Sequence, residues 1–558
     1  MPRADDVLRM RMVGLSRPRN RSFSRLVLRL LIHLEAMSLA PPTYLGAIYA
    51  RLCGKRLRAR LLLAPLLGRT RSAYRLWRLQ QNAIAEENYV LTGDEIDATA
   101  NRIIALVASG DGEDHTLECL AQQGIEARIV DSSCESRCRD LCREEGTWIM
   151  PLEAGDTLAP GAGQIYRRSA STAPNGVDIL YADDDLGPKG VPHFKPSWNR
   201  ELFEYHDYLT GAAIVRLTDR NIADLPLCTP GSTLISHALG QTGDDGGVLH
   251  IPYILHHRRK RPAPRRPGGF ELTASDKARL PTITVIVPTR NHAGLLRECL
   301  TGLSRTEYPT RIEILVIDNG SDNQATLDYL DTLESGFARV LRDDRPFNFA
   351  ALNNHAVAAS SGELICFLNN DIEINDPQWL LFLALQAIRD DVGAVGAQLQ
   401  YPDGRIQHAG VVLGIGGGAA HAHRLLYPNE RGYFDRHALP QFVSAVTAAC
   451  MVMKRDRFLQ VGGFDAENFA VSFNDVDLCM KLNEQGWQTL YEPRAVLVHH
   501  ESVSRGLDRD PVGSTRLGKE TEALQKRWNT ALTPDERTPD PFHHPALSPF
   551  SEQFVLRL

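Results

Sequence analysis

The sequence predicts an α/β protein in which a mostly parallel sheet flanked by helices occurs twice, after a basic helical region. Strand-like apolar runs alternate with helix-like runs over residues 99–258 and again after residue 275. Such alternation is typical of parallel sheets wrapped in helices. The segment "RRKRPAPRRPGGFE", rich in Pro, Gly and Arg, separates the two stretches. Because it lacks periodicity, it predicts a linker.

Length and charge support several domains. With 558 residues, the chain is too long for one ordinary core. The first 80 residues carry 17 Lys/Arg and 3 Asp/Glu, a net charge of +14, whereas the other 478 carry 45 and 65, a net charge of −20. We expect a basic helical region at 1–84, a first α/β domain at 85–258, a linker at 259–274, a second α/β domain at 275–530 and a tail at 531–558.

The basic region predicts amphipathic helices. Its apolar stretch "FSRLVLRLLIHLEAMSLAPPTYLGAIYARL" is interrupted by charged residues and by Pro41–Pro42, so we expect no membrane-spanning helix. Basic amphipathic helices either lie on anionic lipid or pack on a neighbour with a solvated basic face, and the sequence leaves both open. Its arginines alternate with leucines instead of aromatic stacking platforms, so we expect no nucleic-acid partner.

Cysteine usage and the N-terminus predict a cytoplasmic location. The ten cysteines include no CxxC pair and no dense framework, which favours a reducing compartment. Arginines interrupt each apolar stretch near the start, so we expect no secretory signal. Peripheral contact with the inner face of the plasma membrane, through residues 1–84, remains an option.

In the first α/β domain, acidic residues follow two of the predicted strands. "GTWIMPLEAGDTLAP" ends a strand at Glu153 and Asp156, and "GVDILYADDDL" ends another at Asp183–Asp185. These last three aspartates are acidic enough for a metal site, but we favour a solvated turn.

In the second α/β domain, three strands end in polar residues. The strands are "TITVIVPT", "IEILVID" and "GELICFL", and their polar ends are Pro288–Asn291, Asp318–Asp322 and Asn369–Glu373. Ligands of open α/β sheets bind beyond the carboxyl ends of the strands. We therefore expect the three ends to converge on one crevice.

The stretch "LNNDIEI" predicts a metal site at this crevice. Alternate residues of an extended backbone share a face, so Asp371 and Glu373 are expected to lie on one side. Two close carboxylates repel each other unless a cation lies between them. A hard divalent ion held by one or two carboxylates commonly completes its shell with substrate phosphates. A turn would explain the Asn-Asp pair but not the second acid.

Further candidates follow in the C-terminal half of this domain. Asp475 and Asp477 open a helix in "FNDVDLCMKL", where each carboxylate either caps the helix or faces the crevice as a general base. The strand "AVLVHHES" ends in His499 and His500. One of these histidines is a credible third metal ligand, and imidazole favours manganese over magnesium.

Many ordered motifs of residues 281–506 resemble those of family 2 glycosyltransferases with the GT-A fold, in the rhamnosyltransferase-like branch. The matching motifs are "VIVPTRN", "VIDNGSD", "NFAALNNHAVAASSGELICFLNNDIEI", "VGAVGAQLQYPDGRIQHAGVVLGIGG", "VTAACMVMKRD", "GGFD", "FNDVDLCMKL" and "HHESVSRG". The first α/β domain resembles a degenerate, non-catalytic copy of the same fold.

The resemblance implies roles for single residues. Asp475 would be the catalytic base. Mn²⁺ or Mg²⁺ would be bound by Asp371, Glu373 and His499, with His500 as a competitor for His499. The nucleotide-sugar would contact Pro288, Thr289, Arg290, Asn291, Asp318, Asn354, Asn370, Asp371 and Asp477.

The expected function is therefore inverting, metal-dependent transfer of a sugar to a hydroxyl. The donor would be a dTDP- or UDP-linked sugar, with rhamnose favoured by the resemblance, and the acceptor a glycan or lipid-linked molecule of a bacterial surface polysaccharide such as lipopolysaccharide. A single displacement inverts the anomeric configuration. The alternative is an inactive scaffold or sugar-binding protein that recruits other glycosyltransferases to the membrane.

Overall fold

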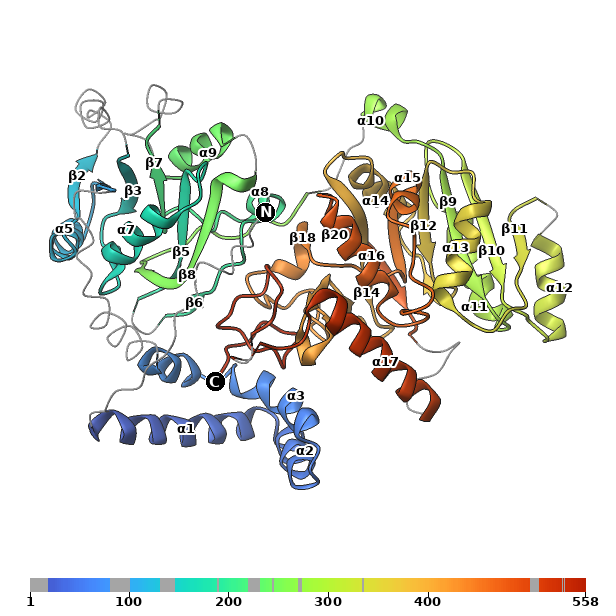
Figure 1. The fold of residues 1–558 in the computed structure, drawn as a ribbon, viewed down its shortest axis with the longest axis horizontal. Coiled ribbons are helices and arrows are strands. Elements are labelled where there is room, and N and C mark those ends of the chain that lie inside the picture. The colour runs from blue at the N-terminus through green and yellow to red at the C-terminus, as the bar shows by residue number, and fades with distance from the viewer. Residues whose placement is uncertain are drawn as a thin grey trace.

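Two α/β units lie side by side in the computed structural model, with a layer of N-terminal helices beneath them (Figure 1). The structure describes residues 19–80, 101–130, 146–187, 190–218, 231–242, 245–268, 273–333, 336–501, 511–533, 535 and 537–558.

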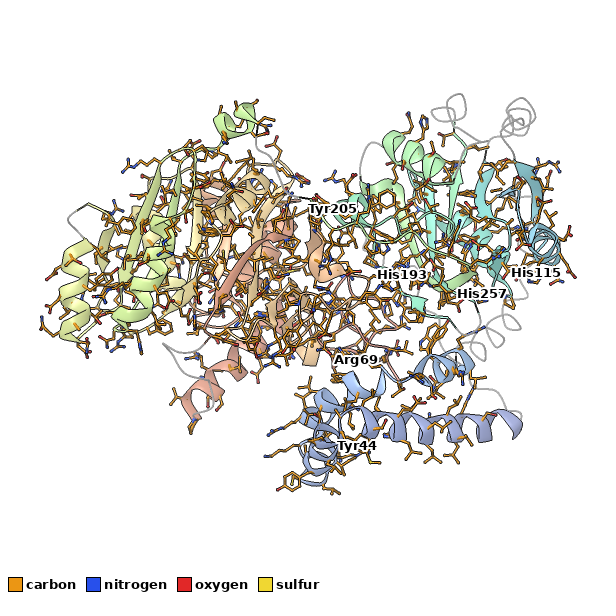
Figure 2. All side chains as sticks on the ribbon, turned by 180° about the vertical axis from the view of Figure 1, so that it is seen from behind. Tyr44, Arg69, His115, His193, Tyr205 and His257 are labelled. Atoms are coloured by element: carbon orange, nitrogen blue, oxygen red, sulfur yellow. The ribbon has the colours of Figure 1, made fainter. Side chains whose placement is uncertain are left out.

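The N-terminal layer consists of α1 (Arg19–Leu39), α2 (Pro41–Leu52) and α3 (Arg56–Leu67). Only a narrow stripe of each helix is buried, such as Ile32 and Ala36 on α1. Tyr44 of α2 lies in this layer (Figure 2) and packs against His33 of α1, with its hydroxyl oxygen 3.0 Å from His33 Nδ1. Among the described helices, none is both long enough and apolar enough to cross a bilayer.

The first sheet has the strand order β2-β1-β3-β7-β5-β8-β4, with β6 paired to β5. Its strands are β1 (Ile103–Ala108), β2 (Glu126–Val130), β3 (Trp148–Glu153), β4 (Thr157–Leu158), β5 (Ile179–Asp185), β6 (Pro192–His193), β7 (Ala213–Arg216) and β8 (Val248–His257). Its helices are α5 (Glu113–Gln122), α7 (Ala162–Thr172), α8 (Arg200–Tyr205) and α9 (Gly231–Gln241). Apolar residues are buried on both faces of this sheet, as expected where helices cover each side.

The second sheet has the order β11-β10-β9-β12-β19-β14-β20-β13, with β15 paired to β14 and β18 to β20. Its strands are β9 (Ile283–Thr289), β10 (Ile312–Asp318), β11 (Arg339–Arg342), β12 (Leu364–Leu368), β13 (Ile372–Glu373), β14 (Val392–Gln400), β15 (Ile406–His408), β18 (Gln441–Val443), β19 (Cys450–Lys454) and β20 (Gln488–His499). A separate hairpin pairs β16 (Val411–Leu413) with β17 (Ala419–His421).

Helices cover both faces of this sheet as well. The helices of the second unit are α10 (Ala274–Arg279), α11 (Ala293–Ser304), α12 (Gln324–Leu333), α13 (Phe349–Ala359), α14 (Trp379–Ala387), α15 (Arg455–Gln460), α16 (Asn474–Glu484) and α17 (Pro511–Trp528). The predicted fold class is thus confirmed, with two mixed, largely parallel sheets and N-terminal helices. The domain boundaries stay predictions, and that at residue 84 lies outside the described residues.

The two sheets are joined through the side chain of Asn199. Its amide nitrogen donates to the Phe442 carbonyl oxygen (2.8 Å), and its amide oxygen accepts from the Phe442 N–H (3.1 Å). Phe442 lies on β18 of the second sheet. The Asn199 side chain therefore makes the same two backbone hydrogen bonds across the interface that a neighbouring strand would make. An ion pair between Arg389 and Glu201 (2.7 Å) supports the same contact.

An apolar cluster joins four parts of the chain. Ala73 belongs to the N-terminal region, Phe194 to the first sheet's unit, Val412 to the hairpin of the second unit, and Leu547 and Phe554 to the C-terminal tail (residues 531–558). Because these residues are buried only when all four parts are in place, the tail is an integral part of the fold.

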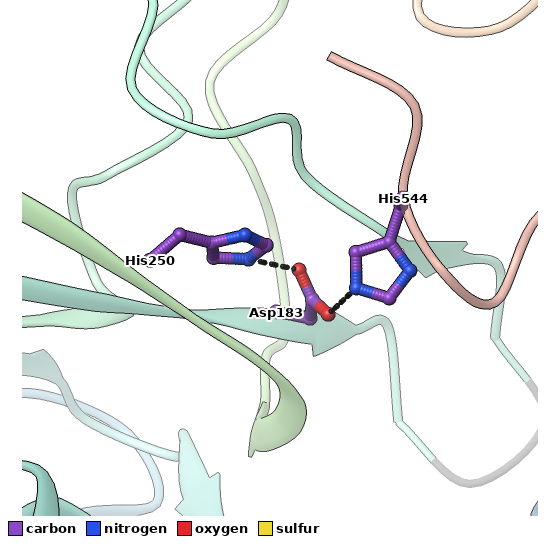
Figure 3. A group of neighbouring side chains, drawn as sticks. All are labelled: Asp183, His250 and His544. Atoms are coloured by element: carbon purple, nitrogen blue, oxygen red, sulfur yellow. Dashed lines mark hydrogen bonds and ion pairs between the residues drawn. The ribbon is translucent and has the colours of Figure 1, made fainter. Parts of the chain in front are cut away.

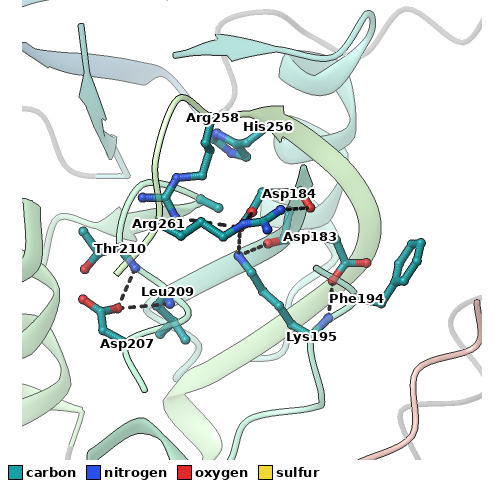
Figure 4. A network of polar contacts seen from close by, with 12 residues as sticks. Asp183, Asp184, Phe194, Lys195, Asp207, Leu209, Thr210, His256, Arg258 and Arg261 are labelled. Atoms are coloured by element: carbon teal, nitrogen blue, oxygen red, sulfur yellow. Dashed lines mark hydrogen bonds and ion pairs between the residues drawn. The ribbon is translucent and has the colours of Figure 1, made fainter. Parts of the chain in front are cut away.

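Three consecutive aspartates at the end of β5, Asp183, Asp184 and Asp185, are fully buried; we call them the aspartate cluster. The expected solvated turn is therefore wrong. Asp184 lies 2.9 Å from the Lys195 ammonium, contacts the Arg261 guanidinium and lies 3.8 Å from Arg258 (Figure 4). Burial raises the pKa of Asp184, but Lys195, Arg261 and Arg258 outweigh this effect and hold the pKa below its usual range.

The other two members of the cluster bind distant segments. Asp183 contacts His544 of the C-terminal tail (2.7 Å), and Asp185 accepts hydrogen bonds from the Tyr74 hydroxyl and from His257 (2.6 Å). The cluster therefore ties the N-terminal region, the residues after β8 and the tail to one strand end.

We expect Asp184→Asn to destabilise the protein by about 3–5 kcal/mol, because a neutral amide leaves buried cations without a counter-charge. The urea midpoint measures this loss. Asp403→Asn, which removes an exposed carboxylate paired with Arg405, is the control and is expected to cost about 1 kcal/mol or less. Equal midpoints for the two variants would contradict the importance of the cluster.

Candidate functional site

The three polar strand ends of the second sheet lie together. β9 pairs in parallel with both β10 and β12, so their carboxyl ends meet at one edge. The Asn370 side chain donates to the Thr289 hydroxyl (3.0 Å), and the Asn319 N–H donates to the Thr289 carbonyl oxygen (2.8 Å). Thr289 therefore links the ends of β10 and β12.

Asn291 and Asp318 shape the loop beside this edge. The Asn291 amide oxygen accepts from the N–H groups of Asp322 (3.1 Å) and Asn323 (3.0 Å). Asp318 is buried, accepts from the Ser321 N–H (3.0 Å) and hydroxyl, and pairs with Arg342. Pro288 is half-buried and Arg290 is exposed at the end of β9.

Asp371 and His499 face each other across the end of the sheet. Asp371 Oδ1 lies 3.1 Å from His499 Nε2, and both residues are buried. This oxygen has no hydrogen-bond partner among the described residues. Antiparallel pairing of β13 with β20 sets Ile372 opposite His499 and so holds the two side chains in place.

Gln407 determines which nitrogen of His499 carries the proton. The Gln407 amide oxygen lies 2.6 Å from His499 Nδ1, and an amide oxygen only accepts, so Nδ1 is protonated. In the neutral imidazole, Nε2 then turns its lone pair toward Asp371 Oδ1. The Asn369 amide nitrogen also lies 3.4 Å from Nε2. Because the Nε2 lone pair and the Asp371 carboxylate oxygen repel each other, their approach is disfavoured unless a cation binds between them.

Glu373 forms a separate pair with His500. Their closest atoms are 3.3 Å apart, and both side chains are partly exposed. Within the described parts of the chain, the donor atoms of Asp371, Glu373 and His499 do not gather within 4.8 Å. The predicted three-ligand site is thus present as two carboxylate–histidine pairs, of which Asp371–His499 is the buried one.

Asp475 lies at the start of α16 next to the same strand ends. It is half-buried, and its carboxylate accepts from the N–H groups of Ala448 (3.1 Å) and Val476 (2.9 Å). The Ala449 carbonyl oxygen accepts from the Asn369 N–H (3.0 Å). The segment 448–449 therefore contacts both Asp475 and the chain that leads to Asp371.

Two other predicted site residues make contacts within the fold. Asp477 is fully buried and binds Lys481 (3.1 Å), Arg527 (2.8 Å) and the Trp528 indole (2.9 Å), which anchors α17. The Asn354 side chain donates to the Phe464 carbonyl oxygen and accepts from the Phe464 N–H. These bonds already use the polar groups of Asp477 and Asn354. The expected contacts of these two residues with the nucleotide-sugar stay predictions.

Gln407 and His421 are site residues that the sequence did not point out as a pair. His421 Nδ1 donates to the Gln407 carbonyl oxygen (3.0 Å). Burial lowers the pKa of His421, while this carbonyl and the Asp475 carboxylate act in the opposite direction. Gln407 lies in β15, a strand of only three residues. So short a strand has no recognisable alternation of apolar and polar residues, so the sequence pattern did not identify Gln407 as a site residue.

A second cluster of potential ligands lies in the first unit. Asp183, His250 and His544 are the group, among the described residues, whose donor atoms lie within 4.8 Å of one another. Asp183 lies between the two rings, 2.9 Å from His250 and 2.7 Å from His544 (Figure 3). The Ala546 N–H donates to His544 Nδ1 (2.9 Å), so His544 Nε2 carries the proton and is a donor, not a ligand. We interpret this cluster as hydrogen-bonded.

Comparison with known proteins defines the class of the second unit. Residues 284–460 match the model of the family described as Glycosyl transferase family 2. The chain therefore contains a family 2 glycosyltransferase domain, which includes Asp371 and the strand ends described above.

Individual relatives are similar over longer or shorter stretches. The O-antigen biosynthesis protein RfbC of Myxococcus xanthus is 32% identical over 473 residues, 77% of this chain and 36% of RfbC. The N-acetylglucosaminyl-diphospho-decaprenol L-rhamnosyltransferase of Mycobacterium tuberculosis is 41% identical over 69 residues, 12% of this chain and 22% of that protein. The chain spans about half or less of the length of the curated relatives it matches.

Among solved structures, a similar one is the mannosyltransferase PcManGT from Pyrobaculum calidifontis in complex with GDP-Man and Mn²⁺. The TM-score is 0.34 at 19% identity, over 45% of this chain and 66% of that chain.

Proposed function

We propose that the protein transfers a sugar from a nucleotide-diphosphate donor to a hydroxyl group, with inversion, in the synthesis of a bacterial surface polysaccharide or glycoconjugate. The observation that carries this proposal is the Asp371–His499 pair, in which an unpartnered carboxylate oxygen faces an imidazole lone pair at 3.1 Å. Asp371 lies within the residues that match the family 2 glycosyltransferase model, and His499 ends β20 of the same sheet.

Asp371 and His499 would hold Mn²⁺ or Mg²⁺ between them. One carboxylate oxygen and one imidazole nitrogen fit a divalent ion whose other positions are taken by water and phosphate oxygens. When bound, the ion stabilises the negative charge of the leaving diphosphate. Glu373 and His500, which follow Asp371 by two residues and His499 by one, form a neighbouring pair and would contact water near the ion.

Asp475 would accept the proton of the acceptor hydroxyl. As the hydroxyl oxygen bonds to the anomeric carbon, the bond from that carbon to the diphosphate breaks, and its electron pair stays on the diphosphate. The proton moves to the Asp475 carboxylate, which lies at the start of α16. One displacement without a covalent intermediate inverts the anomeric configuration.

The donor we favour is dTDP-rhamnose, with UDP-sugars as the second class, and the acceptor is a glycan or lipid-linked molecule. The name of the mycobacterial relative, an L-rhamnosyltransferase acting on a diphospho-decaprenol, supports rhamnose and a lipid-linked acceptor. Arg290, exposed at the end of β9, and the loop held by Asn291 and Asp318 would contact the nucleotide.

The first unit is proposed to be a non-catalytic copy of the same fold. Its acidic strand ends are occupied by cations and donors of the chain itself: the Asp156 side chain accepts from the Arg259 N–H (2.8 Å), and Asp184 is bound by Lys195 and Arg261. Binding of these carboxylates by groups of the chain itself supports a non-catalytic role.

The N-terminal helices are proposed to contact the anionic inner face of the plasma membrane from the cytoplasm. Of the 23 large apolar side chains exposed among the described residues, 12 lie between Leu26 and Leu61. Residues 19–80 also carry 13 Lys/Arg and a single acid, Glu35. Apolar side chains with basic neighbours are the combination that binds anionic lipid.

Calorimetric titration of the full chain with Mn²⁺ and then with UDP or dTDP tests the metal site. We expect metal-dependent binding of one nucleotide, abolished by EDTA and weakened at least about tenfold, or about 1.4 kcal/mol, by Asp371→Ala. Asp376→Ala removes a neighbouring carboxylate that binds the Gln378 N–H and should leave binding unchanged. If neither nucleotide binds, the inactive scaffold becomes the better account.

Asp475→Asn separates binding from transfer. The amide still accepts from the Ala448 N–H, so donor and Mn²⁺ binding should persist, while transfer falls by about 10²–10⁴-fold because the proton acceptor is gone. Product formation from labelled donor measures this. Transfer rates within a few-fold of wild type would remove Asp475 from the role, and Glu467→Gln on the neighbouring loop is the control.

Flotation with phosphatidylcholine vesicles, with and without phosphatidylglycerol, tests the membrane contact. We expect the full chain to float only with the anionic vesicles, less so at high salt because surface charges are screened. Leu30→Ser combined with Leu34→Ser should weaken binding at least about tenfold. Leu459→Ser, an exposed leucine elsewhere, is the control; no flotation of wild type would favour a protein neighbour instead.

A further inference from the structure

We propose that Gln407 is a positioning residue that keeps His499 in the one tautomer able to bind a cation beside Asp371. The inference rests on the proposed function, because it concerns the metal of that same site. It assigns a role to β15, a strand that contributes no residue to the predicted site.

The first step is the contact itself. The Gln407 amide oxygen lies 2.6 Å from His499 Nδ1, and both side chains are buried, so water does not compete for this bond. Metal-binding histidines usually donate their second ring N–H to such an acceptor, which orients the ring and leaves the other nitrogen free for the metal. Here the free nitrogen is Nε2, 3.1 Å from Asp371 Oδ1.

The second step is the orientation of the amide. A glutamine amide can be turned so that its nitrogen or its oxygen faces a partner. In Gln407 the nitrogen lies 3.3 Å from a Glu501 carboxylate oxygen and 3.5 Å from the His499 carbonyl oxygen, both acceptors. Glu501 in turn lies 3.9 Å from Arg424. These contacts hold the amide oxygen toward His499.

The third step is the rigidity of the backbone that carries Gln407. Its carbonyl oxygen accepts from His421 Nδ1 (3.0 Å), and β15 pairs with β14 through His408 and Leu399. The backbone of Gln407 is therefore held both by β14 and by His421 of the β16–β17 hairpin.

Loss of the amide oxygen has a definite consequence. With leucine at this position, His499 Nδ1–H has no acceptor, and the proton moves to Nε2, where Asp371 Oδ1 accepts it. The result is an ordinary His–Asp hydrogen bond in the place of the cation. Second-shell substitutions of this kind typically weaken metal binding by about 10–100-fold.

The test measures Mn²⁺ binding to the full chain by electron paramagnetic resonance, with Mn²⁺ alone and with Mn²⁺ plus UDP or dTDP. We expect Gln407→Leu to weaken binding by about 10–100-fold. Gln398→Leu is the matched control, since Gln398 is another buried glutamine of this sheet that binds the Tyr491 hydroxyl and the His437 carbonyl oxygen.

The outcomes separate the two proposals. If wild type binds Mn²⁺ and Gln407→Leu binds it equally well, the positioning role is overturned and the metal site stands. If wild type binds no Mn²⁺ under any of these conditions, both are overturned.

A readout on the wild-type chain decides the matter if Gln407→Leu fails to fold. The ¹⁵N shifts of histidine-labelled protein, assigned with His499→Ala, are expected to show His499 protonated at Nδ1 and not at Nε2. The opposite tautomer would overturn the proposal.

Discussion

Three buried carboxylates at the end of one strand are the constraint on which the assembly of this protein depends. A buried carboxylate is tolerated only when cations or hydrogen-bond donors surround it. Each member of the aspartate cluster has at least one partner in a different distant segment: Asp183 in the C-terminal tail, Asp184 in the residues after β8, and Asp185 in the N-terminal region. The first unit therefore acts as the anchor for the rest of the chain.

Two buried aspartates of the second unit, Asp477 and Asp371, differ in whether cations of the chain surround them. Asp477 is satisfied by Lys481, Arg527 and Trp528, and like the aspartate cluster it holds elements together. Asp371 is buried as well, but its Oδ1 faces only an imidazole held in the wrong tautomer to donate. The difference between a structural aspartate and the one proposed to bind a metal lies in whether the chain itself supplies the counter-charge.

Sequence patterns predicted the sheets well because strand and helix periodicities are local. The convergence of the strand ends near Thr289 followed from parallel pairing alone. The aspartate cluster was placed in solvent because its partners, such as Tyr74 and His544, are remote in sequence. The shared face expected for Asp371 and Glu373 assumed a continuous strand, whereas β13 begins only at Ile372, so each acid meets a different histidine.

The position of His544 has a consequence for the order in which the molecule is made. This residue follows Asp183 by 361 positions, which a ribosome moving at about 5–20 residues per second covers in about 20–70 seconds. Throughout that time Asp183 of the nascent first unit has His250 and the Lys195 N–H as partners but lacks the contact of its Oδ2 with His544. The contact between Asp183 and His544 therefore forms only after the family 2 glycosyltransferase domain has been synthesised. A chain that terminates before His544 lacks this contact.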